Sequence, residues 1–209
     1  MVTEIRIYAE GGGNDNPSRR TFRTGLNQFL QPLCQLARAE RIRWQVIPCG
    51  SRGVTFRDFK TALRTHPDAL NVLLVDSEEE VTLSPLHHLE KRDGWKTSGL
   101  LEDQCHLMVR CMESWLLADP AALVEFYGQG FRPAALPKSR DVETVAKDKV
   151  AAALEHATRE TQKGRYHKIR HGPDLLGRLD AARVRQRAKH CERLFIVLET
   201  LILSGRKAV

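Results

Sequence analysis

The chain has 209 residues, of which 42% are hydrophobic and 28% are charged, close to the shares in ordinary globular proteins. This length and composition allow a buried core, which excludes collagen-like, low-complexity and wholly disordered proteins. The formal net charge is +7. Two interpretations of this charge are equally favoured: the protein binds a polyanion such as a nucleic acid, or the charge only keeps the protein soluble.

The sequence contains no apolar run near the ~18 residues that a membrane-spanning helix needs, and no apolar signal region at its start. We therefore expect a soluble, cytoplasmic protein with no membrane partner. The five cysteines are scattered and form no C-x-x-C pair, so we expect reduced thiols. Their spacing also matches no common zinc site.

The chain begins with a predicted strand and helix. Residues 4–8 alternate polar and apolar side chains, which is typical of a strand, and lead through Glu10 into three glycines. Residues 18–39 have the spacing of an amphipathic helix, which Pro32 is expected to kink or divide. A second strand is expected at 44–47, followed by a turn at 48–51.

Another helix and a buried strand follow. Residues 55–65 predict an amphipathic helix with Thr55 as its N-cap. Residues 71–75 are continuously apolar, as in a strand that is covered on both faces of a parallel sheet. The order strand, helix, strand, helix, strand predicts an α/β fold with a parallel sheet.

The second half of the chain is predicted to be mostly helical. The expected helices cover residues 103–118, 121–127, 141–161 with Asp141 as cap, and 180–203. Residues 106–109 could instead form a strand, while 85–99, 131–138 and the basic segment 163–172 are expected to be irregular. We place an α/β core at 1–135 and a helical C-terminal part, packed on that core, at 136–209, with one single domain as the alternative.

Three acidic residues are predicted to lie at the ends of strands. Glu10 follows the first strand, and Asp76 and Glu78 follow the apolar one. Residues i and i+2 of an extended segment point to one side, so the latter two carboxylates can face one point. Active sites of open parallel sheets form at the carboxyl ends of the strands, where Glu10 joins them if the strands are neighbours.

Three converging carboxylates repel one another unless a cation neutralises them. Hard oxygen ligands suit Mg²⁺ or Mn²⁺ better than zinc, and the usual partner of such an ion is a substrate phosphate. The N–H groups of Gly11, Gly12 and Gly13 could cradle that phosphate. The two segments together thus predict metal-assisted phosphoryl chemistry. Each segment alone is a weak signal, because glycine runs are common in turns and an acidic run is usually a solvated loop.

Several stretches resemble known proteins. The strand that ends in Glu and glycines, with a later strand that ends in an acid-x-acid pair, resembles the Toprim pattern of topoisomerases, primases and OLD-type nucleases. The whole chain is more closely similar to the bacterial family labelled domain of unknown function 4276. The stretches that carry this similarity are IYAEGGG (7–13), PCGSRGVTF (48–56), LLVDSE (73–78), HLMVRCMESWLLAD (106–119) and ALPK (135–138).

The resemblance implies a Toprim-like, Rossmann-type fold and Mg²⁺-dependent cleavage of DNA or RNA. Under it, Glu10 is a general acid/base or a metal ligand, and Asp76 and Glu78 hold the ion, although the Toprim pattern has Asp where this chain has Glu78. The family resemblance also implies an ATPase partner, as in phage-defence pairs. The alternative is a non-catalytic module that an ATPase regulates, because the apolar segment 194–203 could dock a partner or a second copy.

Two acids in the family's most recognisable segment have two interpretations each. Glu113 is a further catalytic or metal-binding candidate, but it could equally pair with Arg110 one helical turn earlier. Asp119 is expected only to cap the helix that follows Pro120. Trp115 is expected in the core rather than as a stacking platform.

Basic residues provide candidate phosphate contacts. Arg52 follows the second strand and could clamp a phosphate with both arms of its guanidinium, or be a solvated loop residue. The segment around Tyr166 suits a nucleic acid backbone, with a base stacked on the ring, or is a solvated loop. Its basic members are Lys163, Arg165, Lys168 and Arg170. No P-loop motif is present, so ATP hydrolysis by this chain is not expected.

Overall fold

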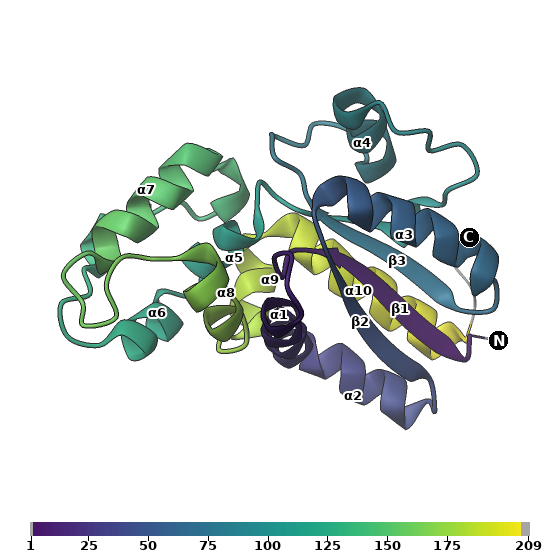
Figure 1. Ribbon diagram of the computed structural model, residues 1–209, viewed down its shortest axis with the longest axis horizontal. Coiled ribbons are helices and arrows are strands. Elements are labelled where there is room, and N and C mark those ends of the chain that lie inside the picture. The colour runs from purple at the N-terminus through teal and green to yellow at the C-terminus, as the bar shows by residue number, and fades with distance from the viewer. Residues whose placement is uncertain (1, 206–209) are drawn as a thin grey trace.

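Four parallel strands form one sheet, in the order β2-β1-β3-β4, in a computed structural model that describes residues 2–205 (Figure 1). The strands are β1 (Glu4–Glu10), β2 (Arg43–Gly50), β3 (Leu70–Asp76) and β4 (Cys105–Met108). Helices cover the sheet on both sides, so the expected α/β fold with a parallel sheet is confirmed, and it is Rossmann-like.

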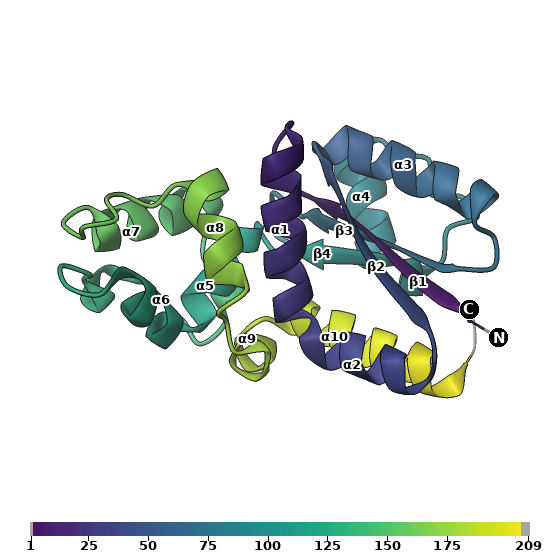
Figure 2. The ribbon, with the colours of Figure 1, turned by 60° about the horizontal axis from the view of Figure 1, so that its bottom comes forward.

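Helices on both faces explain why β3 is buried along its whole length. One face carries α1 (Asn16–Phe29), α2 (Gln31–Ala39) and α10 (Lys189–Ser204), and the other carries α3 (Arg52–Thr65) and α4 (Pro85–Asp93) (Figures 1 and 2). Alternate strand residues enter the two cores: Leu74 packs with the first group of helices and Leu73 with the second.

The strand order creates a switch point between β1 and β3. The chain passes from β1 to β2 on one side and then crosses to β3 on the other side. The connections that leave the carboxyl ends of β1 and β3 therefore run to opposite faces of the sheet and open a crevice between them. Such crevices are where open parallel sheets bind ligands.

The remaining helices lie beside this crevice (Figure 2). They are α5 (Met112–Ala118), α6 (Pro120–Tyr127), α7 (Lys147–Thr158), α8 (Lys168–Leu176) and α9 (Ala181–Arg187), with short 3-10 turns at Glu102–Gln104, Pro133–Ala135 and Val142–Thr144. The α8 helix packs against α1, and α10 returns to pack on β4 and α2. The helical C-terminal part is therefore present, while the division at residue 135 stays a prediction.

Two alternatives left open by the sequence are now decided. The helix expected over 18–39 is divided at Leu30, and Pro32 lies in the first turn of α2, where its missing N–H is not needed. The segment 105–108 is the strand β4, and α5 begins only at Met112. None of the helices within residues 2–205 combines the length and apolar character that crossing a membrane requires.

Four expectations about where elements begin or end were wrong. The α3 helix begins at Arg52, and the Thr55 hydroxyl donates to the Ser51 carbonyl inside it rather than capping it. The turn expected at 48–51 is strand as far as Gly50, because Gly11 and Gly50 exchange backbone hydrogen bonds. The segment 85–99 contains α4, and 131–138 contains a 3-10 turn.

Two expected long helices are interrupted. In the segment 141–161, Asp141 caps only the turn Val142–Thr144, and α7 starts at Lys147. The segment 180–203 breaks at Ala188, whose extended backbone separates α9 from α10. Residues 168–172 of the expected basic loop belong to α8. These breaks follow tertiary packing, because Ala188 is 1% exposed and Glu143 is buried beside His190.

Candidate metal centre

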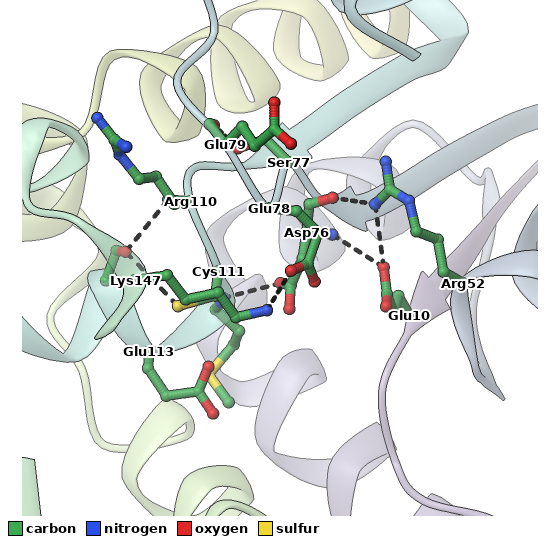
Figure 3. A network of polar contacts seen from close by, with 12 residues as sticks. Glu10, Arg52, Asp76, Ser77, Glu78, Glu79, Arg110, Cys111, Glu113 and Lys147 are labelled. Atoms are coloured by element: carbon green, nitrogen blue, oxygen red, sulfur yellow. Dashed lines mark hydrogen bonds and ion pairs between the residues drawn. The ribbon is translucent and has the colours of Figure 1, made fainter. Parts of the chain in front are cut away.

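Glu10, Asp76 and Glu78 meet at the switch point. Each offers a carboxylate oxygen, and these oxygens all lie within 4.8 Å of one another. Glu10 is the last residue of β1 and Asp76 the last of β3, so neighbouring parallel strands bring them to one edge (Figure 3). Within residues 2–205, this is the only group of three or more Asp, Glu, His or Cys side chains with that geometry.

Backbone hydrogen bonds orient two of these carboxylates. Glu10 Oε2 accepts from the Asp76 N–H at 3.1 Å, and Asp76 Oδ1 accepts from the N–H of Met112, the first residue of α5, at 2.8 Å. The β1–β2 register shifts between Ala9 and Glu10. This shift re-aims the Glu10 side chain relative to the regular alternation of the strand.

Glu78 reaches the cluster by a route that the sequence did not predict. An extended segment was expected, but Glu78 has a φ of 67°, in the left-handed region that a residue with a side chain rarely adopts. Its N–H donates to the Arg110 carbonyl at 2.7 Å, which holds the backbone in this conformation. The two acids of the pair therefore converge through a turn rather than through strand alternation.

The site brings negative charges together in a largely buried position. The pKa of Asp76 is raised to about 7, first by burial and also by the neighbouring Glu10 and Glu113, while Lys168 acts in the opposite direction. Burial also raises the pKa of Glu10, while the Arg52 guanidinium opposes that shift. A cation among the three carboxylates would relieve this repulsion, so the donor set fits a hard divalent ion.

A pocket of about 240 Å³ joins the carboxylates to the glycine loop. Its lining includes Glu10, Asp76, the loop 11–13, Ser18 and Lys168. The backbone φ angles of Gly11, Gly12 and Gly13 are 127°, 83° and 63°, all in the region that favours glycine. A Cβ on Gly11 would lie 2.8 Å from Phe22 Cζ, so the absence of a side chain lets this loop pack directly on α1.

Lysines approach the cluster from the helical part of the chain. Lys168 of α8 places Nζ 3.5 Å from Asp76 Oδ2 and 3.4 Å from Glu113 Oε2. Lys147 of α7 forms an ion pair with Glu78 (Figure 3). Lys147 was not a candidate in the sequence, because its partner is 69 positions away and nothing local marks it.

Arg52 is not free to clamp a phosphate in the way we expected. Its Nε and Nη2 donate to the Asp93 carboxylate at 2.9 and 2.6 Å, which occupies the forked face of the guanidinium. Its Nη1 donates to the Asp76 carbonyl and to Glu10 Oε2, and the group lies 5.0 Å from the centre of the Trp95 ring. Arg52 therefore fixes the walls of the site, and Asp93 was missed for the same reason as Lys147.

The basic segment around Tyr166 is not an exposed stacking surface. The Tyr166 hydroxyl donates inward to Glu113 Oε1 at 3.2 Å, and the ring packs against the main core. Arg165 pairs with Glu155, and Lys163 lies 4.9 Å from the centre of the Phe126 ring. Within the predicted phosphate-binding group of this segment, Lys168 is the member that contacts the carboxylate cluster.

The other residues of the family segment have structural partners. Glu113 is bound by Tyr166 and Lys168, whereas Arg110 pairs with Glu80 at 3.3 Å, so the expected Arg110–Glu113 pair is wrong. Asp119 does not cap α6 with its side chain, which accepts instead from Arg183 Nη1 at 2.8 Å. Trp115 is fully buried, as expected.

A family model described as Domain of unknown function (DUF4276) matches residues 10–199. The chain belongs to this family. The match begins at Glu10, the last residue of β1, and includes all three carboxylates, the strands β2 to β4 and most of α10, so the family pattern extends over most of the sheet and the helical part. Neither a comparison with curated proteins nor one with solved structures found a match. The relation to Toprim proteins therefore stays a prediction.

Proposed function

We propose that this DUF4276 protein is a Toprim-like, Mg²⁺-dependent nuclease that hydrolyses phosphodiester bonds of DNA or RNA. The observation that carries the proposal is the convergence of Glu10, Asp76 and Glu78, with oxygens within 4.8 Å, at the switch point of a parallel sheet. Two of these residues, Glu10 and Asp76, line a pocket and have pKa values that burial raises, which makes them candidates for a functional site.

Glu10, Asp76 and Glu78 would hold Mg²⁺ or Mn²⁺. The bound ion would polarise a phosphoryl oxygen and lower the pKa of its water ligand. Lys168 lines the same pocket and is half-exposed, so its ammonium group can bind a phosphate oxygen there. The Gly11 N–H already donates to the Gly50 carbonyl, which leaves Gly12 and Gly13 as the candidate backbone donors.

The biological setting of the proposal comes from the family resemblance. An ATPase partner and a role in phage defence within the cytoplasm are consistent with a nuclease whose activity must be switched on. Five apolar residues of α10, beginning with Leu194, are buried, whereas Ile196 and Leu203 are 49% and 64% exposed. The helix is therefore mainly a core element, and these two side chains are what it offers a partner or a second copy.

A cleavage panel tests the proposal. Purified protein is incubated with single- and double-stranded DNA and RNA in Mg²⁺, Mn²⁺ or EDTA, and cleavage is expected only with metal. Glu10→Gln and Asp76→Asn should abolish it, because each removes a ligand charge. Glu79→Gln is the matched control, since Glu79 lies in the same loop with its side chain 72% exposed. Cleavage that survives both ligand substitutions, or that proceeds in EDTA, would rule the proposal out.

One observation favours the alternative of a non-catalytic module. Lys147 and Lys168 already neutralise part of the carboxylate cluster, so the site has internal counter-charges. A module of this kind would bind its ATPase partner and need no ion. Thermal unfolding distinguishes the two: a metal-binding site predicts a rise in Tm with Mn²⁺ that Asp76→Asn removes, whereas the module predicts no shift.

A further inference from the structure

A second cavity, the arginine groove, runs along α1 beside the metal centre. It has a volume of about 680 Å³ and lies between the first half of α1 and the carboxyl end of β2. Its basic lining residues are Arg19, Arg20 and Arg23, and its one acidic lining residue is Asp58 of α3. Residues three and four apart on a helix share a face, so these arginines form one positive surface.

The arginines of the groove form no close ion pair with the described residues, and the nearest acid on their own helix is Asp15, which interacts with Arg19 at longer range. Within residues 2–205, no carboxylate lies within ion-pair distance of Arg19, Arg20 or Arg23. Arg23 donates only to the Val46 carbonyl, at 3.0 Å, and Asp58 is paired with Arg57 at 3.1 Å. Elsewhere in the chain, arginines such as Arg52, Arg183 and Arg185 are paired with acids. The positive charge of these arginines is therefore available to an anionic partner outside the chain.

The groove adjoins the pocket of the metal centre, and the Arg19 side chain lies at the boundary between them. Arg19 Nε lies 3.5 Å from the Gly13 carbonyl, and a Cβ on Gly50 would lie 3.3 Å from Arg19 Nη2. Gly13 and Gly50 both line the pocket, while Arg19 lines the groove. A polymer bound in the pocket can thus continue past Arg19 into the groove.

We propose that the arginine groove binds the sugar-phosphate backbone of the nucleic acid strand whose cleaved phosphate lies beside Glu10 and Asp76. This inference rests on the proposed nuclease function and names the path of its substrate. Arg23 lies five positions after Ser18, which lines the pocket, and this corresponds to about 7.5 Å along the helix axis. At ~3.4 Å per phosphate of one strand, that distance spans about two phosphates.

Binding in EDTA tests the groove without requiring catalysis. The anisotropy of labelled oligonucleotides, single- and double-stranded DNA and RNA, is measured over a series of salt concentrations. The test variant is Arg20→Gln with Arg23→Gln. The matched control is Arg38→Gln with Arg41→Gln, which removes the same charge from a basic pocket between α2 and the start of β2.

The test variant should weaken binding about tenfold at 0.1 M salt, for all sequences alike. The slope of log affinity against log salt should fall by about 1.4 for a single strand or 1.8 for a duplex, because two phosphate contacts are lost. The control should keep both values. Equal losses of affinity in the two variants would show a general effect of charge and would overturn the proposal that the arginine groove binds the backbone.

The proposal for the arginine groove and the proposed nuclease function can be disproved separately. If the wild type cleaves nucleic acid with Mn²⁺ and the test variant binds and cleaves as well as the wild type, the nuclease stands and the groove is wrong. If the wild type neither binds nor cleaves nucleic acid, both fail. Preferential binding of the groove to anionic vesicles or to acidic proteins, lost in the test variant, would also overturn this proposal.

Discussion

The Glu10 carboxylate accepts a hydrogen bond from the backbone N–H of Asp76 at 3.1 Å, across 66 positions of sequence. This bond lies at the edge where β1 and β3 end, so the two strands and the two acids are positioned together. The Asp76 side chain turns the other way and accepts from Met112, which ties the helical part of the chain to the same point. The positions of Glu10 and Asp76 are thus a property of the sheet, whereas Glu78 is held by the segment that follows β3.

Arg52→Lys should destabilise the protein by about 2 kcal/mol, although the charge is kept. A lysine cannot reproduce the fork that binds Asp93, Glu10 and the Asp76 carbonyl from a position only 14% exposed. Urea denaturation measures the change in the free energy of unfolding. Arg57→Lys, on the same helix but 70% exposed, is the control and should stay within about 0.5 kcal/mol. Equal effects would contradict the role of Arg52.

Lys168→Met should lower the stability of the metal-free protein by about 1 kcal/mol. Lys168 neutralises the buried Asp76 and Glu113, but its side chain is 49% exposed, so solvent screening reduces the loss below that of a buried pair. Adding Mn²⁺ should recover more stability in the variant than in the wild type, because a cation then compensates the lost charge. Lys149→Met on α7 is an exposed control, and thermal unfolding with and without Mn²⁺ is the measurement.

Gly25→Ala should be strongly destabilising, by about 3 kcal/mol. A Cβ at Gly25 would lie 2.0 Å from the Pro173 carbonyl oxygen, so α1 and α8 could not keep their packing. These helices carry the arginine groove and Lys168, and binding of Mn²⁺ should weaken as well. Gly53→Ala is the matched control: nothing lies within 4 Å of its Cβ, and the alanine should stabilise by about 0.5 kcal/mol. Urea denaturation of the two variants measures their free energies of unfolding, and a Gly25→Ala variant as stable as Gly53→Ala would contradict the close packing of α1 on α8.

His106 should make the protein less stable as the pH falls. Burial, with the Arg193 charge, lowers the pKa of His106 to about 3 from the ordinary 6.5, and its ring nitrogens are bonded to Arg193 and the Asp103 carbonyl. The folded state thus keeps the ring neutral, while the unfolded chain binds a proton below pH 6.5. Stability contributed by this group is complete above pH 6.5 and is lost at up to about 1.4 kcal/mol per pH unit below it.

Chemical denaturation from pH 7 to 4.5 measures this slope. The His106→Gln variant should be less stable at pH 7 and should lose less stability on acidification than the wild type. His156→Gln, at an exposed position of α7, should keep the wild-type slope. An unchanged slope in His106→Gln would mean that the ring already takes up a proton in the folded protein.

Much of the sheet and part of the site could be predicted from local sequence. The continuous apolar run of β3 reflects burial on both faces of the sheet, and the alternation in β1 reflects the two-residue repeat of a strand, so both strands could be predicted from residue type. Because Glu10 and Asp76 each end one of these strands, a parallel sheet with the two strands as neighbours brings the two acids together. The Asp76 and Glu78 carboxylates converge because the Arg110 carbonyl holds Glu78 in a left-handed backbone conformation, and not through strand alternation. Local sequence does not reveal this contact.

Helix breaks and ion pairs were less predictable, since they depend on partners distant in sequence. The apolar periodicity that predicted one helix over 180–203 continues through Ala188, and only its burial against the rest of the chain explains the interruption. Asp93 pairs with Arg52 across 41 positions, and Tyr166 turns toward Glu113 across 53. Residue type alone does not distinguish such paired side chains from solvated ones.

The amino-acid sequence by itself determined the α/β class, the family and the three acids, because strand patterning and motif spacing are local properties of the polymer. The tertiary structure alone decided which charges meet. It pairs Arg52 with Asp93, brings Lys168 to Asp76, and leaves the arginines of α1 without a close ion pair among residues 2–205. Electrostatic interactions depend on distance in space and on burial, and the folded sheet and its helices set both.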